Sequence, residues 1–511
     1  MVINVPRFIR RLVNKQVITA LLILIQLGAI IYVFYRLSQY FVYLYIALVL
    51  LSMIIVVYIL NRSDNPSYKL SWSILILILP FVGGVLYLIL GGKRIPKEFR
   101  KEMIQSSNQK QPYLVQDHFL FEQIENEDNQ LLKQTKYLYN NAFFPVFKNT
   151  STDFLINGED KFESMKQELK KAKKYIFLEY FIINEGVMWN AIYSILREKA
   201  SEGVDVRLIF DDFGSYKLSK DFIKHNNEVG IKTVVFNPLR PKLAIFMNNR
   251  NHRKICVIDG MVGYVGGINI ADEYINAITR FGHWKDSAVM IKGEAVWSLT
   301  VMFLTFYHSI TKIKEDVLTF KPNYEDIKSD GFVQPFADSP TDDEMVGESA
   351  HLNLIHYAKD TLYIQTPYLV IGHNMLNSLS VAAKNGVDVR IMLPHIPDKW
   401  YVQIVSRSNY EMLLKAGVKI YEYEPGFIHS KTMVADEKAA IVGTTNMDFR
   451  SYYMHFECGI LFINSKVVQQ VKQDFILTQH QCIEITLEDV QKRNVFVRIA
   501  SAILSMFSAL L

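Results

Sequence analysis

The chain has 511 residues, of which 21% are charged and 50% are hydrophobic, a composition that excludes a disordered chain and a highly charged coiled coil. Lysine and arginine number 56 against 51 for aspartate and glutamate, too small a bias to indicate a nucleic-acid partner. The cysteines are Cys256, Cys458 and Cys482, without a C-x-x-C pair, which excludes a disulfide framework and a cysteine-built zinc site and fits a reducing compartment.

Three long apolar runs occupy the N-terminal part of the chain, at residues 17–35, 40–60 and 71–90. Each approaches the roughly 20 residues that a helix needs to cross a hydrocarbon core. Residues 1–91 are therefore predicted to be a membrane region of two or three hydrophobic helices. A cleaved signal peptide is not expected, because no small-residue cleavage site follows the first run.

Basic residues flank this membrane region on both sides. They are Arg7, Arg10, Arg11 and Lys15 before it, and Lys93, Arg94, Lys97, Arg100 and Lys101 after it. The positive-inside bias assigns both groups to the cytoplasm. Three spans would separate the groups, whereas two spans, with the first run re-entrant or in the interface, keep both inside. We expect a multi-pass protein with a cytoplasmic C-terminal part, and the first run stays open.

The rest of the chain carries the same series of segments twice. Gly-Val-Asp-Val-Arg at 203–207 recurs at 386–390, and Asn-His-Arg-Lys at 251–254 matches Ile-His-Ser-Lys at 428–431. A separation of roughly 180 residues indicates two domains and not a solenoid. Helical stretches alternate with short β-branched and aromatic runs, so each half is predicted to be an α/β domain with helices packed on a central sheet.

Composition also sets the expected boundaries. Residues 92–150 are predicted to be a polar connector with some helix, 151–325 the first domain and 326–485 the second. A stretch rich in Pro, Gly, Asn and Asp at 321–339 separates the domains. Residues 486–511 are predicted to form an amphipathic helix, because apolar residues recur at steps of three and four: Val495, Phe496, Ile499, Ile503, Phe507 and Leu510. This helix either docks on the protein's own surface or lies on an anionic membrane.

The pattern His-x-Lys-x4-Asp occurs once in each half. Its residues are His252, Lys254 and Asp259 in the first copy and His429, Lys431 and Asp436 in the second. On a strand, residues two apart share one face, so each histidine projects with its lysine. Asn269 and Asn446 follow at matching positions. One copy would be a weak signal, but two copies in a duplicated unit indicate a paired site.

These residue types favour phosphoryl chemistry through a phosphohistidine. An imidazole can act as nucleophile or as acid and base near neutral pH. The two lysines and the amides of Asn269 and Asn446 supply donors around an anion. No metal-ligand spacing occurs in the sequence, so we expect the positive donors to neutralise charge where other enzymes use a metal.

A catalytic histidine needs an acid on its second nitrogen to orient it. Asp286 and Glu457 occupy equivalent positions in the two halves, each at the start of an apolar strand. We predict that each orients the histidine of the opposite half; the alternative is a pair of ordinary strand-edge acids. Asp259 and Asp436 either touch substrate or hold turns.

Two further histidines, His283 and His455, lie near these acids but lack the motif context. They are predicted to be surface residues.

The paired motifs resemble those of the phospholipase D superfamily. More narrowly, Asn-Asn-Arg-Asn-His-Arg-Lys at 248–254, Gly-Tyr-Val-Gly-Gly at 263–267 and Asn-Met-Asp-Phe-Arg-Ser at 446–451, with the N-terminal apolar runs, resemble bacterial cardiolipin synthases. The resemblance runs from about Tyr40 to the C-terminal tail. Gly267 stands where many superfamily members have Ser, a change that the synthases share, and the first apolar run looks extra relative to a two-span synthase.

The resemblance implies two phospholipase D-like α/β domains related by a pseudo-twofold duplication, preceded by transmembrane helices in a bacterial plasma membrane. It implies transfer of a phosphatidyl group from one phosphatidylglycerol to another, giving cardiolipin and glycerol without a metal, nucleotide or other cofactor. His252 is the expected nucleophile and His429 the acid and then the base, with the reverse assignment open. The expected partners are phosphatidylglycerol and membrane lipids and no nucleic acid, and no oligomeric state is predicted.

Other functions use the same or related residues. A phospholipase D that hydrolyses membrane phospholipids to phosphatidic acid would differ only in taking water as acceptor. The synthase is favoured because the spans hold the site where a second lipid alcohol is abundant. A nuclease of the superfamily would need a basic groove, and a non-enzymatic scaffold would be expected to lose a motif residue.

Overall fold

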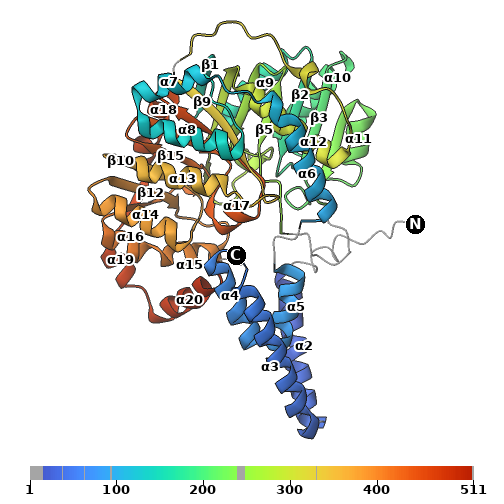
Figure 1. Cartoon of the computed structure of the whole chain (residues 1–511), viewed down its shortest axis with the longest axis vertical. Helices are drawn as coiled ribbons and strands as arrows, with labels where there is room; N and C mark the ends of the chain where they lie inside the picture. The colour runs from blue at the N-terminus through green and yellow to red at the C-terminus, as the bar shows by residue number, and fades with distance from the viewer. Residues whose placement is uncertain are drawn as a thin grey trace. The chain divides into compact units, whose positions relative to one another are not determined.

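The computed structural model describes residues 15–36, 38–62, 64–91, 95–238, 248–329 and 331–508. Arg7, Arg10, Arg11, Lys93, Arg94 and Leu510, on which expectations were placed, lie outside these residues. The chain divides into a helical N-terminal unit and a larger α/β unit (Figure 1).

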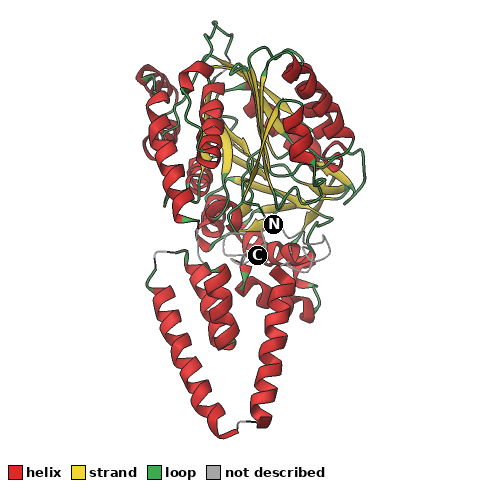
Figure 2. Ribbon diagram, turned by 90° about the vertical axis from the view of Figure 1, so that its right-hand side faces the viewer, coloured by secondary structure: helices red, strands yellow, loops and turns green. Residues whose placement is uncertain are grey.

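In its described residues the N-terminal unit has the helices α2 (Lys15–Arg36), α3 (Ser38–Leu60), α4 (Pro66–Ile78) and α5 (Pro80–Leu90). Figure 2 shows α2 and α3 as two long arms that open out from their junction. Among the described residues, one helical segment, Val42–Leu60 of α3, is both long and apolar enough to cross a membrane.

The expectation of a single helix over residues 71–90 is wrong, because the run is divided into α4 and α5 at Leu79 and Pro80. Proline lacks an N–H and disfavours a helical backbone in the residue before it. The two short helices pack against each other at Gly83, where a Cβ atom would lie 2.7 Å from Ile76 Cα.

Polar side chains from the two long helices bind the backbone at this break. Gln26 Oε1 of α2 accepts a hydrogen bond from the Val82 N–H at 3.0 Å, and Ser52 Oγ of α3 donates to the Pro80 carbonyl at 3.2 Å. Both side chains are buried. Irregular backbone in an apolar region needs such partners, which explains polar residues in otherwise apolar helices.

The first half of the α/β unit has a seven-stranded sheet in the order β1-β8-β6-β5-β2-β3-β4. Its strands are β1 (Thr150–Leu155), β2 (Tyr175–Tyr180), β3 (Asp205–Asp211), β4 (Ile231–Phe236), β5 (Ile255–Ile258), β6 (Val262–Gly266) and β8 (Ala288–Gly293). β2, β3 and β4 are parallel, and the other pairs are antiparallel. β2, β5 and β6 are buried along their length, as their apolar composition predicts.

The second half repeats this arrangement in an eight-stranded sheet, β19-β13-β12-β10-β15-β16-β18-β9. Its strands are β9 (Phe332–Asp338), β10 (Thr361–Gln365), β12 (Asp388–Pro394), β13 (Lys419–Tyr423), β15 (Thr432–Ala435), β16 (Ala439–Gly443), β18 (Glu457–Ile463) and β19 (Cys482–Ile485). Again three strands, β10, β12 and β13, are parallel. The duplicated α/β fold predicted from the repeated segments is confirmed.

The helices form layers on both sheets. They are α9 (Gly158–Leu169), α10 (Val187–Ser201), α11 (Phe222–Glu228), α12 (Val296–Thr311), α13 (Val346–Tyr357), α14 (His373–Lys384), α15 (Trp400–Ser408), α16 (Tyr410–Ala416), α17 (Phe449–Tyr453) and α18 (Lys466–Gln479). A shared core packs α12 and α18 with side chains of both sheets, while separate cores lie under the outer helices of each half. The shared core holds the two halves face to face.

The segment expected to be a connector is part of this packing. α6 (Lys97–Lys110) lies against α12, and Ser106 Oγ donates to the Thr305 carbonyl at 3.0 Å. α7 (His118–Glu127) and α8 (Asn129–Ala142) place Ile124 and Leu131, respectively, in the outer core of the second half. These residues therefore stabilise the α/β unit.

The tail forms α19 (Leu487–Gln491) and α20 (Val495–Met506). Ser501 and Ser505 of α20 bind Ile404 and Ser408 of α15 through their hydroxyl groups. The apolar side chains of α20 face outward, with Phe496 76% and Val495 60% exposed.

Candidate active site

The two motif histidines are attached by their backbones to the opposite half of the duplication. The His252 N–H donates to the Phe456 carbonyl at 2.9 Å, and the His429 N–H donates to the Lys285 carbonyl at 2.6 Å. Each contact lies beside a short parallel pairing: Asn251 with Phe456, and β14 (Gly426–Ile428) with β7 (His283–Lys285). Each histidine therefore sits next to the acid that follows in the other half.

The side chains complete this crossed arrangement. His252 Nδ1 lies 2.9 Å from Glu457 Oε1, and His429 Nδ1 lies 2.6 Å from Asp286 Oδ2. All four side chains are buried. The acids meet the opposite half's histidines as the sequence predicted. A carboxylate on Nδ1 fixes the tautomer with its lone pair on Nε2, so both Nε2 atoms are free to react.

The motif lysines lie beside these histidines. Lys254 Nζ donates to the His252 carbonyl at 2.6 Å, and Lys431 Nζ donates to the His429 carbonyl. Burial lowers the pKa of Lys254 to about 7 and that of Lys431 to about 8, although Glu457 and Asp286 oppose the shift. Buried lysines that give up their proton so readily gain strongly from a bound anion.

The histidines are neutral in this environment. Burial is the largest cause that lowers the pKa of His252 and His429 well below the usual value, and the charges of Lys254 and Lys431 add to it. Burial also raises the pKa of Asp286 to about 6. A neutral imidazole can act as a nucleophile, and a phosphate between the lysines would restore the proton affinity of the second histidine.

Gly267 and Thr444 occupy equivalent positions in the two halves, and each lies beside the acid of its own half. At Gly267 a Cβ atom would lie 2.1 Å from Asp286 Oδ1, so that position requires glycine. The matching residue of the second half is Thr444, whose hydroxyl donates to Glu457 Oε2. The two halves thus hold their acids by different means.

The predicted amide donors differ in how they are used. Asn269 Oδ1 accepts from the Ile182 N–H at 2.9 Å, and its Nδ2 donates to Tyr274 Oη at 2.7 Å. Asn446 is buried, and its Oδ1 has no hydrogen-bond partner in the described residues. Asn269 therefore supports the site through Tyr274, and Asn446 has more capacity to bind a ligand.

Of the two alternatives for Asp259 and Asp436, contact with substrate or support of a turn, the hydrogen bonds favour the turn. The carboxylate of Asp259 accepts the N–H groups of residues 173–175, and that of Asp436 those of residues 359–361. Both residues have positive φ, at 54° and 51°. Asp259 follows β5 and Asp436 follows β15, so each lies at the end of its strand that is opposite to the motif histidine. Their hydrogen bonds connect β5 to the start of β2 and β15 to the start of β10.

The prediction that His455 lies on the surface is wrong. Its side chain is only 10% exposed, and its ring centroid lies 5.6 Å from that of His252. Burial lowers the pKa of His455 to about 3. His283, by contrast, is exposed as expected, and its Nδ1 lies 2.9 Å from Tyr423 Oη. The two histidines are not at equivalent positions, because His283 lies three residues before Asp286 and His455 lies two residues before Glu457.

Buried acids below the first motif were missed by the sequence prediction. Glu179, at the end of β2, accepts from Asn251 Nδ2 at 2.8 Å. Asp211, at the end of β3, accepts from the Asn251 N–H at 3.0 Å and pairs with Arg250 at 3.3 Å. The carboxyl ends of these parallel strands thus anchor the segment before His252, and acidic residues ending adjacent strands were the available signal.

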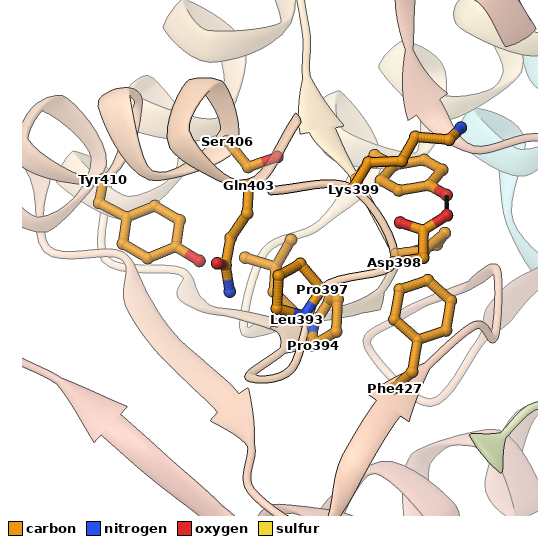
Figure 3. A pocket seen from close by; sticks show the side chains of 11 residues that line it. Leu393, Pro394, Pro397, Asp398, Lys399, Gln403, Ser406, Tyr410 and Phe427 are labelled. Carbon is orange, nitrogen blue, oxygen red and sulfur yellow. Dashed lines mark hydrogen bonds between the residues drawn. The ribbon is translucent and has the colours of Figure 1, made fainter. Parts of the chain in front are cut away.

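Aromatic rings surround His429, and a small pocket lies beyond one of them. Tyr274, Trp284 and Phe427 have ring centroids 5.4–5.7 Å from His429. Beyond Phe427 lies a small pocket, and Figure 3 shows Asp398, Lys399 and Phe427 on one side of it, with Tyr410 on the other. Tyr368, which also lines this pocket, donates to Asp398 Oδ2 at 2.6 Å.

One group of side chains in the described residues has the spacing of metal ligands: His252, His455 and Glu457, whose ligand atoms lie within 4.8 Å of one another. Two of the three form the hydrogen-bonded pair described above. An ion bound here would compete with that pair.

Family models match most of this unit and part of the N-terminal one. The model described as "Cardiolipin synthase, PLD-like domain" matches residues 165–296 and 351–478. The model described as "Phospholipase_D-nuclease N-terminal" matches residues 50–92.

Relatives of known sequence cover nearly the whole chain. A cardiolipin synthase of Halalkalibacterium halodurans is 36% identical over 89% of this chain and 91% of the relative. A cardiolipin synthase of Staphylococcus aureus is 34% identical over 89% and 93%. An uncharacterized protein of Streptococcus mutans is 40% identical over 89% and 99%.

A solved structure shares the fold. Phosphatidylserine synthase from Haemophilus influenzae superimposes with a TM-score of 0.57 over 74% of this chain and 97% of that chain, at 14% identity. At this identity the likeness concerns the fold alone.

Proposed function

The chain belongs to the cardiolipin synthases with phospholipase D-like domains, and we propose that its crossed histidine–acid pairs make cardiolipin by two successive phosphatidyl transfers. It is a phosphatidyltransferase of the phospholipase D type. The observation that carries the mechanism is the placement of Glu457 on His252 and of Asp286 on His429, each from the opposite half.

In the first transfer, His252 Nε2 attacks the phosphorus of one phosphatidylglycerol. A nitrogen–phosphorus bond forms and the bond from phosphorus to the glycerol oxygen breaks. His429, protonated once the phosphate is bound, gives its proton to the leaving glycerol. Lys254 and Lys431 neutralise the charge that builds on the phosphoryl oxygens. Glu457 stabilises the positive charge that develops on His252.

In the second transfer, His429 is neutral and acts as a base. It takes the proton from a hydroxyl of a second phosphatidylglycerol while that oxygen bonds to phosphorus and the nitrogen–phosphorus bond breaks. His252 is released, His429 is again protonated, and the product is cardiolipin. Water in place of the lipid would give phosphatidic acid, so exclusion of water decides the yield.

The membrane arrangement that we propose has two spans and a re-entrant pair. α3 contains the segment that is long and apolar enough to cross the hydrocarbon core. α2, of 22 residues, has the length for a second crossing, because a helix rises about 1.5 Å per residue. α4 and α5 have 13 and 11 residues, and each is too short to cross. Together they form a re-entrant pair that enters the membrane and leaves it on the same side. Both basic segments then lie in the cytoplasm, as does the α/β unit.

We also propose that α20 lies on the membrane surface. Its serine face binds α15, and its apolar face is left exposed. A helix with one polar face and one exposed apolar face can lie at the headgroup boundary of a bilayer. Truncation after Asp489 should therefore lower activity on vesicles more than on detergent-dispersed lipid. Equal losses on both would favour docking on the protein's own surface.

Incubation of the purified protein with labelled phosphatidylglycerol, followed by separation of the lipids, tests the function. We expect cardiolipin and glycerol from the wild type and none from His252→Ala or His429→Ala, both still inserted in membrane. Phosphatidic acid as the main product would assign a hydrolase, and near-normal synthesis by either variant would contradict the two-histidine mechanism.

A further inference from the structure

The turn between β12 and α15 forms one wall of the small pocket that Phe427 lines. Pro394 and Pro397, which line the pocket, restrict the backbone of this turn. Asp398 accepts the hydrogen bond from Tyr368 Oη, and Lys399 precedes the first residue of α15. The turn therefore presents Lys399 in a defined position.

The ammonium of Lys399 is available to a ligand. Nζ lies 5.4 Å from the centroid of the Tyr368 ring, and among the described residues it forms no ion pair. The side chain is exposed. A cation–π contact positions a lysine weakly and does not neutralise it, so the positive charge stays open to an anion.

A chain of aromatic contacts links Lys399 to His429. The Tyr368 ring centroid is 6.4 Å from that of Phe427, and the Phe427 ring is 5.7 Å from that of His429. After burial and the motif lysines, the charge of Lys399 contributes to the lowered pKa of both His252 and His429. Lys399 is thus a further cation whose charge acts on the site, and the aromatic contacts place it on the His429 side.

The surface around Lys399 suits a lipid. Trp400, the next residue, is 66% exposed, and Ile396 of the same turn is 38% exposed. α15 begins at Trp400 and binds α20, which carries the exposed Phe496; Figure 1 shows the two helices at the same edge of the α/β unit. Exposed aromatic and apolar side chains beside a lysine are typical of surfaces at headgroup level.

We propose that Lys399 binds the phosphate of the acceptor phosphatidylglycerol during the second transfer. The inference rests on the proposed function, because it concerns a lipid acceptor. That acceptor carries its own phosphate, separated from the attacking hydroxyl by a three-carbon glycerol. When the hydroxyl reaches His429, this phosphate lies one glycerol length from the phosphorus held on His252. Lys254 and Lys431 serve that first phosphorus, so the second anion needs a cation farther out.

This role makes Lys399 a residue that selects the acceptor. Water and free glycerol carry no phosphate and gain nothing from Lys399. A phosphatidylglycerol gains a charge-assisted contact in the second transfer, whose proton still goes to His429. The choice between cardiolipin and phosphatidic acid therefore depends on Lys399, while formation of the phosphatidyl-histidine does not.

The test compares three acceptors in the full-length enzyme. Vesicles of phosphatidylglycerol are assayed for cardiolipin, for phosphatidic acid, and for exchange of labelled free glycerol into phosphatidylglycerol. Lys399→Gln should lower cardiolipin formation about tenfold, the usual cost of a lost hydrogen bond to a charged group. Glycerol exchange and hydrolysis should stay within about twofold of the wild type. Lys399→Arg should retain cardiolipin formation.

Lys384→Gln, which removes an exposed lysine at the end of α14, is the matched control and should leave all three activities unchanged. Equal losses of all three activities in Lys399→Gln would indicate a structural or general catalytic role and overturn the proposal, as would an unchanged product ratio. A wild-type enzyme that exchanges glycerol but forms no cardiolipin would instead overturn the proposed function and this inference with it.

Discussion

Glu457 of the second half holds Nδ1 of His252 of the first half at 2.9 Å, and both groups are buried. Asp286 and His429 repeat the relation in the opposite direction at 2.6 Å. Neither half alone contains a histidine with its orienting acid. The duplication therefore builds one site from two incomplete ones, and the shared core around α12 and α18 keeps them together.

We predict that Glu457→Gln and Asp286→Asn each lower kcat by about two to four orders of magnitude, as the loss of an orienting carboxylate does in hydrolytic triads. Both variants should remain folded, because amide and carboxyl groups have similar size. Single-turnover assays with labelled phosphatidylglycerol and circular dichroism measure the two properties. Glu484→Gln on the exposed edge strand β19 is the control, and wild-type kcat in Glu457→Gln would contradict the orienting role.

Asp259→Asn should affect stability and not chemistry. The aspartate accepts three backbone N–H groups at the start of β2, and an amide can accept only with its one oxygen. A loss of about 1 kcal/mol is expected, because the amide replaces only part of the hydrogen bonding to the charged carboxylate, while the N–H groups of Lys173 and Lys174 are exposed and can bind water. Thermal unfolding measures it, and single turnover well below the melting temperature should remain near normal. A stable protein that lacks activity would return Asp259 to the catalytic group.

The sequence predicted what is periodic or duplicated in this molecule. Both sheets, the two motifs and the crossed acids follow from repeated segments, because equivalent residues of a duplicated fold occupy equivalent places. The sequence analysis failed where tertiary contacts determine the position of a residue. His455 carries no motif, yet the bridge between Asn251 and Phe456 draws it to His252. Hydropathy could not reveal that Pro80 turns the third apolar run back, because both helices remain apolar.

The lowered lysine pKa values predict the pH dependence. Lys254 and Lys431, with pKa values of about 7 and 8, are charged below those values and lose their charge as pH rises through them. The free enzyme then binds phosphate poorly, so kcat/KM should fall between about pH 7 and 8. Bound phosphate raises both pKa values, so the alkaline fall of kcat should lie at higher pH. Coincident profiles of kcat and kcat/KM would contradict this.

Zinc should inhibit and not activate. His252, His455 and Glu457 offer two nitrogens and a carboxylate within 4.8 Å of one another, a donor set that suits Zn²⁺. An ion there would occupy the nucleophile or its acid. EDTA should therefore leave activity intact, and micromolar zinc should reduce it reversibly. His455→Asn should weaken the inhibition, and loss of activity in EDTA, restored by a divalent ion, would contradict the metal-free mechanism.

The covalent intermediate provides the most direct test of the two histidines. In His429→Ala, His252 keeps its contact with Glu457 and its neutral imidazole, so it can still attack phosphorus. The first transfer is slowed by the missing acid, and the second lacks a base to activate the next alcohol. A phosphatidyl group should therefore accumulate on the peptide that contains His252. The linkage is a phosphoramidate and should be acid-labile. Labelled phosphatidylglycerol, rapid denaturation at alkaline pH and peptide mapping would locate it. Label on the peptide with His429 in the reciprocal His252→Ala variant, and none in His429→Ala, would reverse the two roles. No label in either variant would indicate direct displacement by the second lipid, in which both histidines act only as acid and base.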